Sequence, residues 1–245
     1  MYREIKQLIK TIIPKSMLFK HERKFRFLFY QFYKGVSFQC NVCNKKLRKF
    51  ILLKDGDKLC PFCGSLSRTR RLWKIITAEY LKKGISILDF SPSRSLYRVL
   101  KNIKGINYSS TDISGDFLSD FQYDITDINS GNDKFDLICC YHILEHIEND
   151  NQAMKELFRV LKKGGTSIIQ TPFKEGDIYE DPTFDTATER LKHFGQRDHV
   201  RIYSANGLKD RLVKCGFHVT IKQFDEPEDN KFGFKAKEEL LICTK

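Results

Sequence analysis

Two pairs of cysteines constrain the first third of the chain more than any other feature of its sequence. Cys40 and Cys43 form one C-x2-C pair, Cys60 and Cys63 form a second, and 16 residues separate the pairs. Each pair places two thiolates on one tight turn, and two such turns facing each other complete a tetrahedral sulfur shell that suits Zn²⁺. Because cysteine fills all four ligand positions, the predicted zinc ion is structural.

The alternative to a zinc site is a pair of disulfides or a redox-active C-x2-C pair. A lone redox pair, however, needs no duplicate at this spacing. The other four cysteines lie within apolar runs and are predicted to be small core residues: Cys139, Cys140, Cys215 and Cys243. Metal-bound thiolates and unpaired core cysteines both require a reducing compartment, which predicts a cytoplasmic protein.

Positive charge is concentrated in the same part of the chain. Residues 1–84 contain 21 Lys and Arg against 5 Asp and Glu, whereas residues 85–245 contain 22 against 26. This asymmetry predicts a basic surface that meets the phosphates of a lipid, a nucleic acid or a sugar carrier. No run approaches the roughly 18 to 20 apolar residues of a membrane span, and the first residues are too polar for a signal peptide, so neither is expected.

Residues 1–37 are expected to form basic helices with apolar and aromatic faces. Apolar residues recur at helical spacing over 5–13, and residues 25–33 are densely aromatic beside Arg and Lys. Such segments suit the interface of an anionic bilayer, here the inner face of the membrane, although they can equally pack on the rest of the protein. Residues 38–66 form the predicted zinc ribbon, and residues 67–84 form a helix that links it to the body.

The body, residues 85–245, alternates short apolar strands with helical segments. The seven expected strands are 85–90, 106–113, 121–125, 135–141, 167–170, 217–224 and 240–244. The expected helices are 95–103, 151–161 and 205–215. This alternation predicts a mostly parallel sheet with helices on both faces, in which ligands bind beyond the carboxyl ends of the strands.

Carboxylates follow the first three of these strands. Asp89 fits a cofactor with an amino or amide end, and Asp112 is placed for ribose hydroxyls. Asp124 suits an adenine amino group, because a carboxylate accepts hydrogen bonds and an amine donates them. Each carboxylate alone is a weak signal, but together, in order, they indicate a nucleoside-containing cofactor.

Several segments of the chain, taken in order, carry a family resemblance. The motifs in the body are FDLI (135–138), LEHI (144–147) and ELFRVLKKGG (156–165). They resemble the core of class I S-adenosylmethionine-dependent methyltransferases of the type 11 kind. Further motifs are CPFCGSL (60–66) with Arg68, SLY (95–97), DITD (124–127) and FGQRDHVRIY (194–203). These are similar to a bacterial group that joins a four-cysteine zinc module to the methyltransferase domain and is associated with surface polysaccharide or other glycan pathways.

The resemblance implies a Rossmann-like, seven-stranded, doubly wound sheet and S-adenosylmethionine as the cofactor. It places Asp89 and the loop of Ser91, Pro92 and Ser93 beside the methionine part of the cofactor. It also places Asp112 on the ribose diol. The other implied cofactor residues are Asp124 and Ile125 beside adenine, and Tyr141 at the end of the fourth strand. One departure is that Ser91-Pro92-Ser93 replaces the family's Gly-x-Gly, which removes the backbone freedom of glycine.

The loop Gln196 to Arg201 is the expected source of the catalytic residues. It has no periodic apolar pattern, and such loops often contain catalytic groups. His199 is predicted as the general base, Asp198 as its partner or as an acceptor for a substrate hydroxyl, and Arg201 as the ligand of a substrate phosphate or carboxylate. The alternative is a lid held by Arg–Asp pairing. His142, Glu145 and His146, near the fourth strand, are further candidates for the base. For Glu145 and His146 the favoured interpretation is that they cap and orient the helix that follows them.

The sequence thus predicts a methyltransferase that acts on a hydroxyl, or less readily an amine, of a sugar or glycan intermediate. One alternative is RNA methylation with the basic zinc ribbon as a clamp, so nucleic acid stays a possible partner. The acidic body and the lack of an Asn-Pro-Pro-aromatic segment argue against RNA. The other alternative is a non-catalytic protein that docks on a partner through its zinc ribbon.

Overall fold

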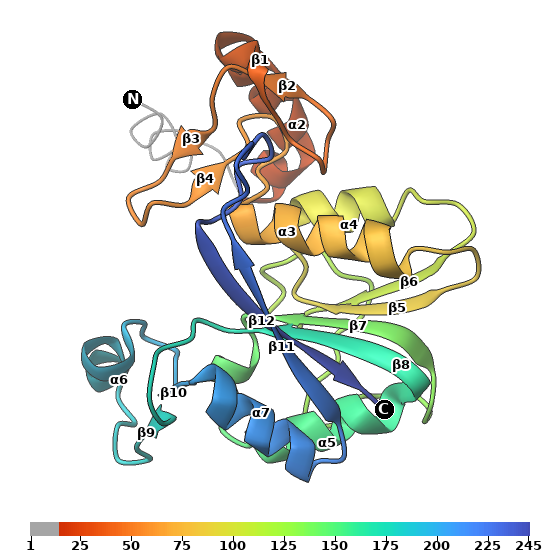
Figure 1. Cartoon of the computed structure of the whole chain (residues 1–245), viewed down its shortest axis with the longest axis vertical. Helices are drawn as coiled ribbons and strands as arrows, with labels where there is room; N and C mark the ends of the chain where they lie inside the picture. Colours follow the sequence, from red (N-terminus) through yellow and green to blue (C-terminus); the bar gives the residue numbers. More distant parts are fainter. Residues whose placement is uncertain (1–14) are drawn as a thin grey trace. The chain divides into compact units, whose positions relative to one another are not determined.

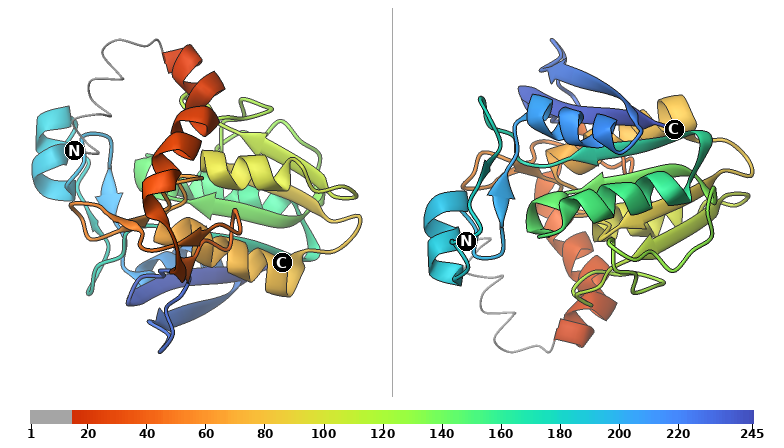
Figure 2. Two further views of the ribbon diagram at one scale, coloured as in Figure 1. Left: turned by 90° about the horizontal axis from the view of Figure 1, so that it is seen from above. Right: turned by 90° about the horizontal axis from the view of Figure 1, so that it is seen from below.

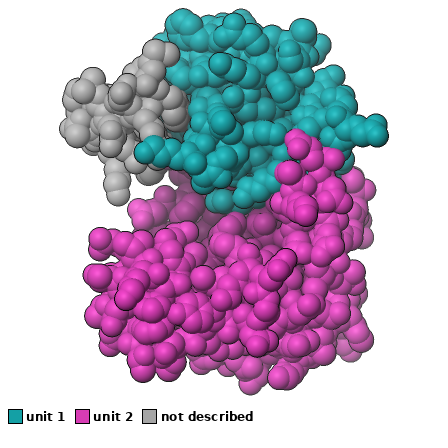
Figure 3. Space-filling model, turned by 60° about the vertical axis from the view of Figure 1, so that its left-hand side comes forward, with its two compact units in different colours: residues 1–74, 227–235 teal, residues 75–226, 236–245 magenta. Residues whose placement is uncertain are grey.

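The computed structural model describes residues 15–245, which divide into two units. Unit 1 contains the chain up to Lys74 together with Pro227–Lys235, and unit 2 contains Ile75–Glu226 together with Ala236–Lys245 (Figure 3). The apolar repeat expected over residues 5–13 lies outside the described residues. Each unit is discontinuous in sequence, because the chain returns to unit 1 once before it ends in unit 2.

Unit 1 contains a helix, two short hairpins and the beginning of a second helix. Its elements are α2 (Lys15–Tyr30), the 3-10 helix η1 (Gln31–Tyr33), β1 (Lys34–Gln39), β2 (Lys46–Leu47), β3 (Ile51–Leu52), β4 (Lys58–Leu59) and α3 (Ser67–Ile75). Strand β1 pairs antiparallel with β2, and β3 pairs antiparallel with β4 (Figure 1). Each hairpin leads into or encloses one C-x2-C turn, so the ribbon is built from two similar knuckles.

The segment 227–235 belongs to unit 1 because of Arg70. This arginine is fully buried, and its Nε donates a 2.6 Å hydrogen bond to the carbonyl of Phe232. Its Nη2 donates to the carbonyl of Gly233 at 2.7 Å, and its Nη1 donates to the carbonyl of Ser65 at 2.8 Å. A buried guanidinium is stable only when its donors are satisfied, so Arg70 fixes this late segment to the ribbon.

Unit 2 is built on a six-stranded sheet with the order β11-β12-β8-β7-β5-β6. Its strands are β5 (Ser86–Phe90), β6 (Asn107–Thr111), β7 (Phe135–Tyr141), β8 (Leu161–Gln170), β11 (His218–Asp225) and β12 (Lys237–Thr244). Strands β6, β5, β7 and β8 are parallel, whereas β12 is antiparallel to both β8 and β11. The predicted Rossmann-like, doubly wound architecture is confirmed.

The predicted number of seven strands is wrong, because residues 121–125 do not form a strand. Within the described chain this region has only isolated bridges, one of which joins Asp124 to Asp127. The carboxylate of Asp124 accepts hydrogen bonds from the N–H and the hydroxyl of Thr126, both at 2.8 Å. These local bonds close a turn that competes with an extended strand.

Helices cover both faces of the sheet (Figures 1 and 2). Helix α4 (Arg94–Leu100) lies on one face, and α5 (Asp150–Val160) and α7 (Ala205–Lys214) lie on the other. The main core forms between α5, α7 and the sheet, and includes Leu88, Ile138, Met154, Leu157, Ile169, Leu208, Leu212 and Leu241. The side chain of Asn149 caps α5, so the expected capping by Glu145 or His146 is not observed.

The remaining short elements of unit 2 precede the sheet, follow β7 or follow β8. They are the π-helical segment η2 (Ile76–Tyr80), the 3-10 helix η3 (Leu144–His146), β9 (Tyr179–Glu180), α6 (Ala187–Phe194) and β10 (Arg201–Ile202). Strand β10 pairs antiparallel with β9. Across residues 15–245, no helix is both long and apolar enough to cross a membrane.

Candidate active site and metal clusters

The four predicted zinc ligands lie together in unit 1. The sulfur of Cys40 lies 3.6 Å from that of Cys63, and the sulfur of Cys43 lies 3.8 Å from that of Cys60. Four sulfurs bound at about 2.3 Å to one zinc ion are about 3.8 Å apart, whereas disulfide sulfurs are only about 2.05 Å apart. All four cysteines are free thiols, so their arrangement fits a tetrahedral zinc ion and not two disulfides.

Neighbouring groups hold the four sulfurs in this arrangement. The hydroxyl of Ser65 lies 3.2 Å from the sulfurs of both Cys40 and Cys63, and Gly64 adopts a left-handed φ of 78° at the turn. Hydrogen bonding to Cys43 lowers the pKa of Cys40, whereas hydrogen bonding to Cys40 raises the pKa of Cys63. Adjacent thiolates repel one another, so a divalent cation is needed for all four to be ionised.

The first expected cofactor residue lies near the carboxyl end of β5. Asp89 is buried, and the hydroxyl of Tyr108 donates a 3.0 Å hydrogen bond to its carboxylate. Burial raises the pKa of Asp89 to about 7, although the hydrogen bond from Tyr108 lowers it. The side chain of Asp89 is therefore close to half protonated at neutral pH.

The loop after β5 keeps a backbone shape that glycine usually provides. Ser91, in the place of the family's first glycine, has a left-handed φ of 43°. Its hydroxyl donates a 2.7 Å hydrogen bond to Asp112, and the hydroxyl of Ser114 donates a 2.8 Å hydrogen bond to the other oxygen of that carboxylate. Asp112 thus accepts from two hydroxyl donors, and a ribose diol offers donors of the same type. Pro92 is buried, and Ser93 caps α4.

The other three expected cofactor residues have different environments. Asp124 is exposed, and its side chain closes the turn at Thr126. Ile125 is buried in the main hydrophobic core of unit 2, so its side chain does not face an open edge of the sheet. Tyr141 is half-buried at the end of β7, which lies beside β5, so Tyr141 and Asp89 share the carboxyl edge of the sheet.

A cluster of one carboxylate and two imidazoles lies beyond the end of β7. The ligand atoms of Glu145, His146 and His199 all lie within 4.8 Å of one another. The rings of His146 and His199 meet edge to face with their centroids 4.7 Å apart. Glu145 is 1% exposed and His199 is 4% exposed. Burial lowers the pKa of His199, and His146 lowers it further, so the His199 imidazole is neutral at neutral pH.

A left-handed residue directs the chain from β7 into this cluster. His142 has a φ of 57°, and its N–H donates a 2.7 Å hydrogen bond to the carbonyl of Gln170 at the end of β8. The chain then enters η3, where the carbonyl of Glu145 accepts a 2.9 Å hydrogen bond from the N–H of Val200. This bond joins η3 to the segment that contains His199. Backbone strain of the kind seen at His142 is common at functional sites.

Arg201 holds the main chain of η3 in place. Its guanidinium donates hydrogen bonds to the carbonyls of Leu144, Ile147 and Glu148, and its Nε donates to Glu180 at 2.6 Å. Arg201 is also buried. In this structure Arg201 positions the turn that contains Glu145 and His146, and its binding of a substrate anion stays a prediction.

Asp198 contacts His146, although the sequence indicated His199 as its partner. One carboxylate oxygen and the carbonyl oxygen of Asp198 each lie 3.3 Å from Nδ1 of His146. The carboxylate is largely exposed, so it orients His146 from the solvent side. Glu145 and His146 were candidate bases from the sequence, but their grouping with His199 was not predicted, because only the fold brings the two segments together.

Comparison with known protein families shows the family of this chain. The family model described as a methyltransferase domain matches residues 66–221, which is more than half of the chain. The chain belongs to this methyltransferase family. A comparison with curated protein sequences gives no match. The family match confirms the prediction of an S-adenosylmethionine-dependent methyltransferase.

Solved structures share the fold of this methyltransferase at low sequence identity. An S-adenosylmethionine-dependent methyltransferase from Archaeoglobus fulgidus has a TM-score of 0.51 and 17% identity, over 73% of this chain and 93% of that chain. A structure of the Haloferax volcanii Trm112 methyltransferase activator in complex with a methyltransferase has a TM-score of 0.50 and 15% identity, over 71% of this chain and 88% of that chain. A methyltransferase from Thermotoga maritima has a TM-score of 0.50 and 16% identity, over 73% and 88%.

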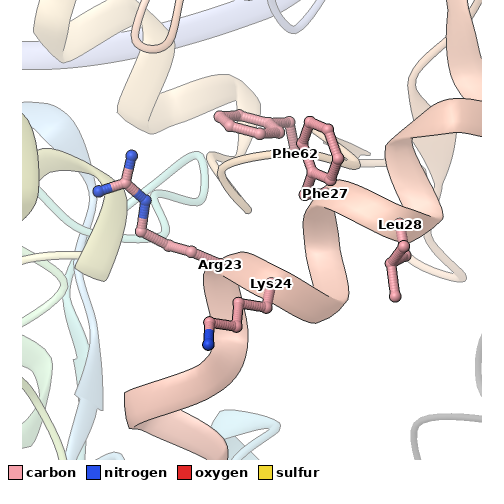
Figure 4. Close-up of a pocket in the computed structure, with 5 residues that line it drawn as sticks. All are labelled: Arg23, Lys24, Phe27, Leu28 and Phe62. Atoms are coloured by element: carbon pink, nitrogen blue, oxygen red, sulfur yellow. The ribbon is translucent and has the colours of Figure 1, made fainter.

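Unit 1 of the methyltransferase also exposes apolar side chains on α2. Phe27 is 51% exposed and Leu28 is 63% exposed. Figure 4 shows the hollow that these two residues line together with Arg23, Lys24 and Phe62. Exposed apolar side chains next to lysine and arginine are typical of surfaces that bind anionic amphiphiles.

Proposed function

We propose that this methyltransferase transfers a methyl group to a hydroxyl of a sugar or glycan intermediate. The observation that carries the proposal is the cluster of Glu145, His146 and His199 beyond the end of β7, in which Glu145 and His199 are buried. A hydroxyl must lose its proton as its oxygen is methylated, and this cluster contains the groups that favour that loss. The resemblance of the sequence to glycan-associated methyltransferases supports a sugar over other hydroxyl compounds.

The carboxyl edge of the sheet would hold the cofactor in this proposal. When bound, S-adenosylmethionine supplies an electrophilic methyl group attached to a sulfonium. Asp112 would bind the ribose hydroxyls, and the loop of Ser91 to Ser93 would lie against the methionine part. Asp89, whose buried carboxyl accepts a hydrogen bond from Tyr108, would also border the methionine part. The chain then contributes alignment, because the acceptor oxygen, the methyl carbon and the sulfur must lie nearly in line.

The acceptor hydroxyl would be deprotonated at the Glu145, His146 and His199 cluster. Such a cluster acts in one of two ways: a neutral imidazole accepts the proton, or a cation held by the side chains lowers the pKa of the hydroxyl. Without a cation, His199 is the proposed base, because its imidazole is neutral at neutral pH. Asp198 would support the cluster by orienting His146.

The proposal is tested by following a labelled methyl group into cell fractions. Purified protein is incubated with labelled S-adenosylmethionine and with separate pools of glycans, lipids and RNA. We expect label in the glycan pool, and we expect Asp112→Asn to lower it at least tenfold. The matched control is Asp116→Asn, an exposed carboxylate in the same loop. Label in RNA alone would replace this function with RNA methylation, and a lack of label in every pool would contradict it.

We also propose that the four cysteines of unit 1 bind a structural zinc ion. The sulfur separations of 3.6 and 3.8 Å support this metal, because they match the edges of a tetrahedral zinc–thiolate site. Zinc would supply much of the folding energy of the ribbon, whose paired strands are short. The measurement is the zinc content of purified protein, expected to be at least one ion per chain.

A third proposal is that α2 contacts an anionic membrane surface. The exposed side chains of Phe27 and Leu28 and the neighbouring Arg23 and Lys24 support it. Flotation with vesicles of about one-third anionic lipid should recover wild-type protein, and recovery should fall with Leu28→Ser. Leu191→Ser, at an exposed position of α6, is the matched control. Equal recovery with neutral vesicles, or binding to RNA in place of vesicles, would contradict the proposal.

A further inference from the structure

We propose that Glu145, His146 and His199 form a metal site for a divalent transition-metal cation, separate from the cysteine cluster. Two imidazole nitrogens and one carboxylate oxygen are a common ligand set for Zn²⁺, Fe²⁺ and related ions. The existence of the site stands on the geometry of unit 2 alone. Only its role in methyl transfer rests on the proposed function.

The three ligand atoms have nearly the separations that one cation requires. They lie within 4.8 Å of one another, and two ligands bound at about 2.1 Å are at most about 4.2 Å apart. Small side-chain rotations therefore bring all three onto one ion. The main chain beneath them is fixed, because Val200 donates to the carbonyl of Glu145 and Arg201 holds the carbonyls on both sides of it.

The carboxylate of Glu145 is the strongest indication of a missing cation. It is 1% exposed, and neither of its oxygens accepts a hydrogen bond from the described residues. One basic atom, Nδ1 of His142, lies 3.2 Å from one oxygen. A buried carboxylate without hydrogen bonds is strongly destabilising unless a cation compensates its charge. Arg201 does not fill this role, because its hydrogen bonds go to Glu180 and to main-chain carbonyls.

The contacts of His146 indicate which nitrogen binds the ion. Its Nδ1 faces the carbonyl and the carboxylate of Asp198, both at 3.3 Å, so Nδ1 carries the proton and Nε2 is left to coordinate. Histidines that bind metals usually donate their second N–H to a carboxylate or a carbonyl in this way. Asp198 is therefore a positioning residue for His146, with no direct bond to the metal.

The site has the composition of a catalytic metal site. Three protein ligands leave coordination positions open, whereas a structural zinc site is closed by four. His146 is 30% exposed, while Glu145 and His199 are buried, so solvent reaches the cluster at His146. A cation here would lower the pKa of a bound hydroxyl. His199 would then serve as a ligand, and the metal would replace it in promoting loss of the proton.

The test is titration with Co²⁺ by calorimetry of protein that contains one zinc ion per chain, at its four cysteines, without S-adenosylmethionine or an acceptor. Co²⁺ is chosen because it binds imidazole and carboxylate ligands and does not displace zinc readily from four thiolates. Near-ultraviolet absorption shows any binding to sulfur. We expect one Co²⁺ per chain without a thiolate band, at least tenfold weaker binding by Glu145→Gln, and no change for Glu148→Gln, a largely exposed carboxylate in the same turn.

Two outcomes would overturn the site. One is a lack of saturable Co²⁺ binding by wild-type protein up to about 1 mM, and the other is equal binding by Glu145→Gln and wild type. If Glu145→Gln does not fold, His146→Gln at a partly exposed position repeats the test. A protein that binds Co²⁺ but methylates no glycan would keep the site and refute the proposed function. The reverse result would keep the function and leave His199 as the base.

Discussion

The cysteine cluster of unit 1 and the Glu145, His146 and His199 cluster of unit 2 differ in how completely their ligands enclose a metal. Four thiolates at the separations of a tetrahedral zinc site leave no position for a substrate. The second cluster offers three ligands, one of them a buried carboxylate without hydrogen bonds and one a partly exposed imidazole. The first arrangement suits a fold that depends on its metal, and the second suits exchange of a ligand at an ion.

The two clusters also differ in how the chain assembles them. Each half of the cysteine cluster comes from one tight turn, so the sequence spacing alone brings two ligands together. In the second cluster, η3 must meet the segment before β10, and Arg201 must hold the turn between them. A metal site made by local turns is visible in a sequence, whereas one made by tertiary contacts is not.

The largest expected effect is the loss of folding of unit 1, but not of unit 2, when a cysteine of the cluster is replaced. Cys60→Ser removes one of the four proposed zinc ligands, and structural zinc contributes on the order of 10 kcal/mol to the folding of such modules. Limited proteolysis should then cleave unit 1 while unit 2 stays resistant. The control is Cys215→Ser, a half-buried cysteine outside the cluster. Unchanged zinc content in Cys60→Ser would contradict zinc binding by the cysteine cluster of unit 1.

The second prediction concerns the pH dependence of the stability of unit 2, which Asp89 affects. The pKa of Asp89 is about 3.9 in an unfolded chain and rises to about 7 in the folded protein because of burial. The folded state therefore binds this proton more tightly, and the contribution of Asp89 to stability is greatest below about pH 4 and is lost progressively up to about pH 7. Between about pH 4 and pH 7, loss of this contribution lowers the free energy of unfolding by about 4 kcal/mol. Asp89→Asn should abolish this pH-dependent change.

Urea unfolding of wild type and Asp89→Asn at several pH values measures this difference. Asp116→Asn controls for the loss of one carboxylate at an exposed position of unit 2. The expected change belongs to unit 2 alone, so a probe in unit 1 should show no effect of the substitution. Parallel pH profiles for wild type and Asp89→Asn would mean that the carboxyl is not held in its neutral form.

The third prediction concerns turnover at the open cluster. His199→Ala should lower methyl transfer by about 100-fold or more, whether His199 is a base or a metal ligand. The dissociation constant for S-adenosylmethionine should change by less than about twofold, because the expected cofactor residues follow other strands. His218→Ala, an exposed histidine of β11, is the matched control. Normal turnover in His199→Ala would exclude the cluster from the reaction.

The smallest expected effect tests the cofactor edge itself. Asp112→Asn should weaken S-adenosylmethionine binding by about tenfold. The carboxylate has two acceptor oxygens for the two ribose hydroxyls, whereas the amide has only one, and that oxygen carries no charge. Calorimetry measures the affinity, and the Co²⁺ stoichiometry should stay unchanged in the same variant. A loss of Co²⁺ binding in Asp112→Asn would show that the metal cluster and the cofactor edge are not independent.

The fold was largely predictable because its signals are local. Short apolar strands alternating with helices indicated the doubly wound sheet, and the spacing of the cysteines indicated their cluster. The exception, residues 121–125, fails because Asp124 binds Thr126 and closes a turn, a local preference that outweighs the apolar pattern. In the same turn, Asp124 is exposed and the neighbouring Ile125 is buried in the core.

The candidate site was less predictable because it depends on tertiary contacts. A charged residue in a polar loop, such as Arg201, indicated a substrate ligand, but the fold turns it onto main-chain carbonyls. Glu145 and His146 precede a helix and therefore indicated capping, yet Asn149 caps that helix. The assignments of the cofactor and catalytic residues stay predictions that the variants above test.

The capture of Pro227–Lys235 by Arg70 determines when the protein can finish folding during synthesis. The ribbon leaves the ribosome early, but its buried guanidinium lacks two carbonyl partners until Phe232 and Gly233 have also emerged. Nearly the whole polypeptide must therefore be translated before its first region reaches the native state. Release of a natively folded amino-terminal fragment is therefore not expected.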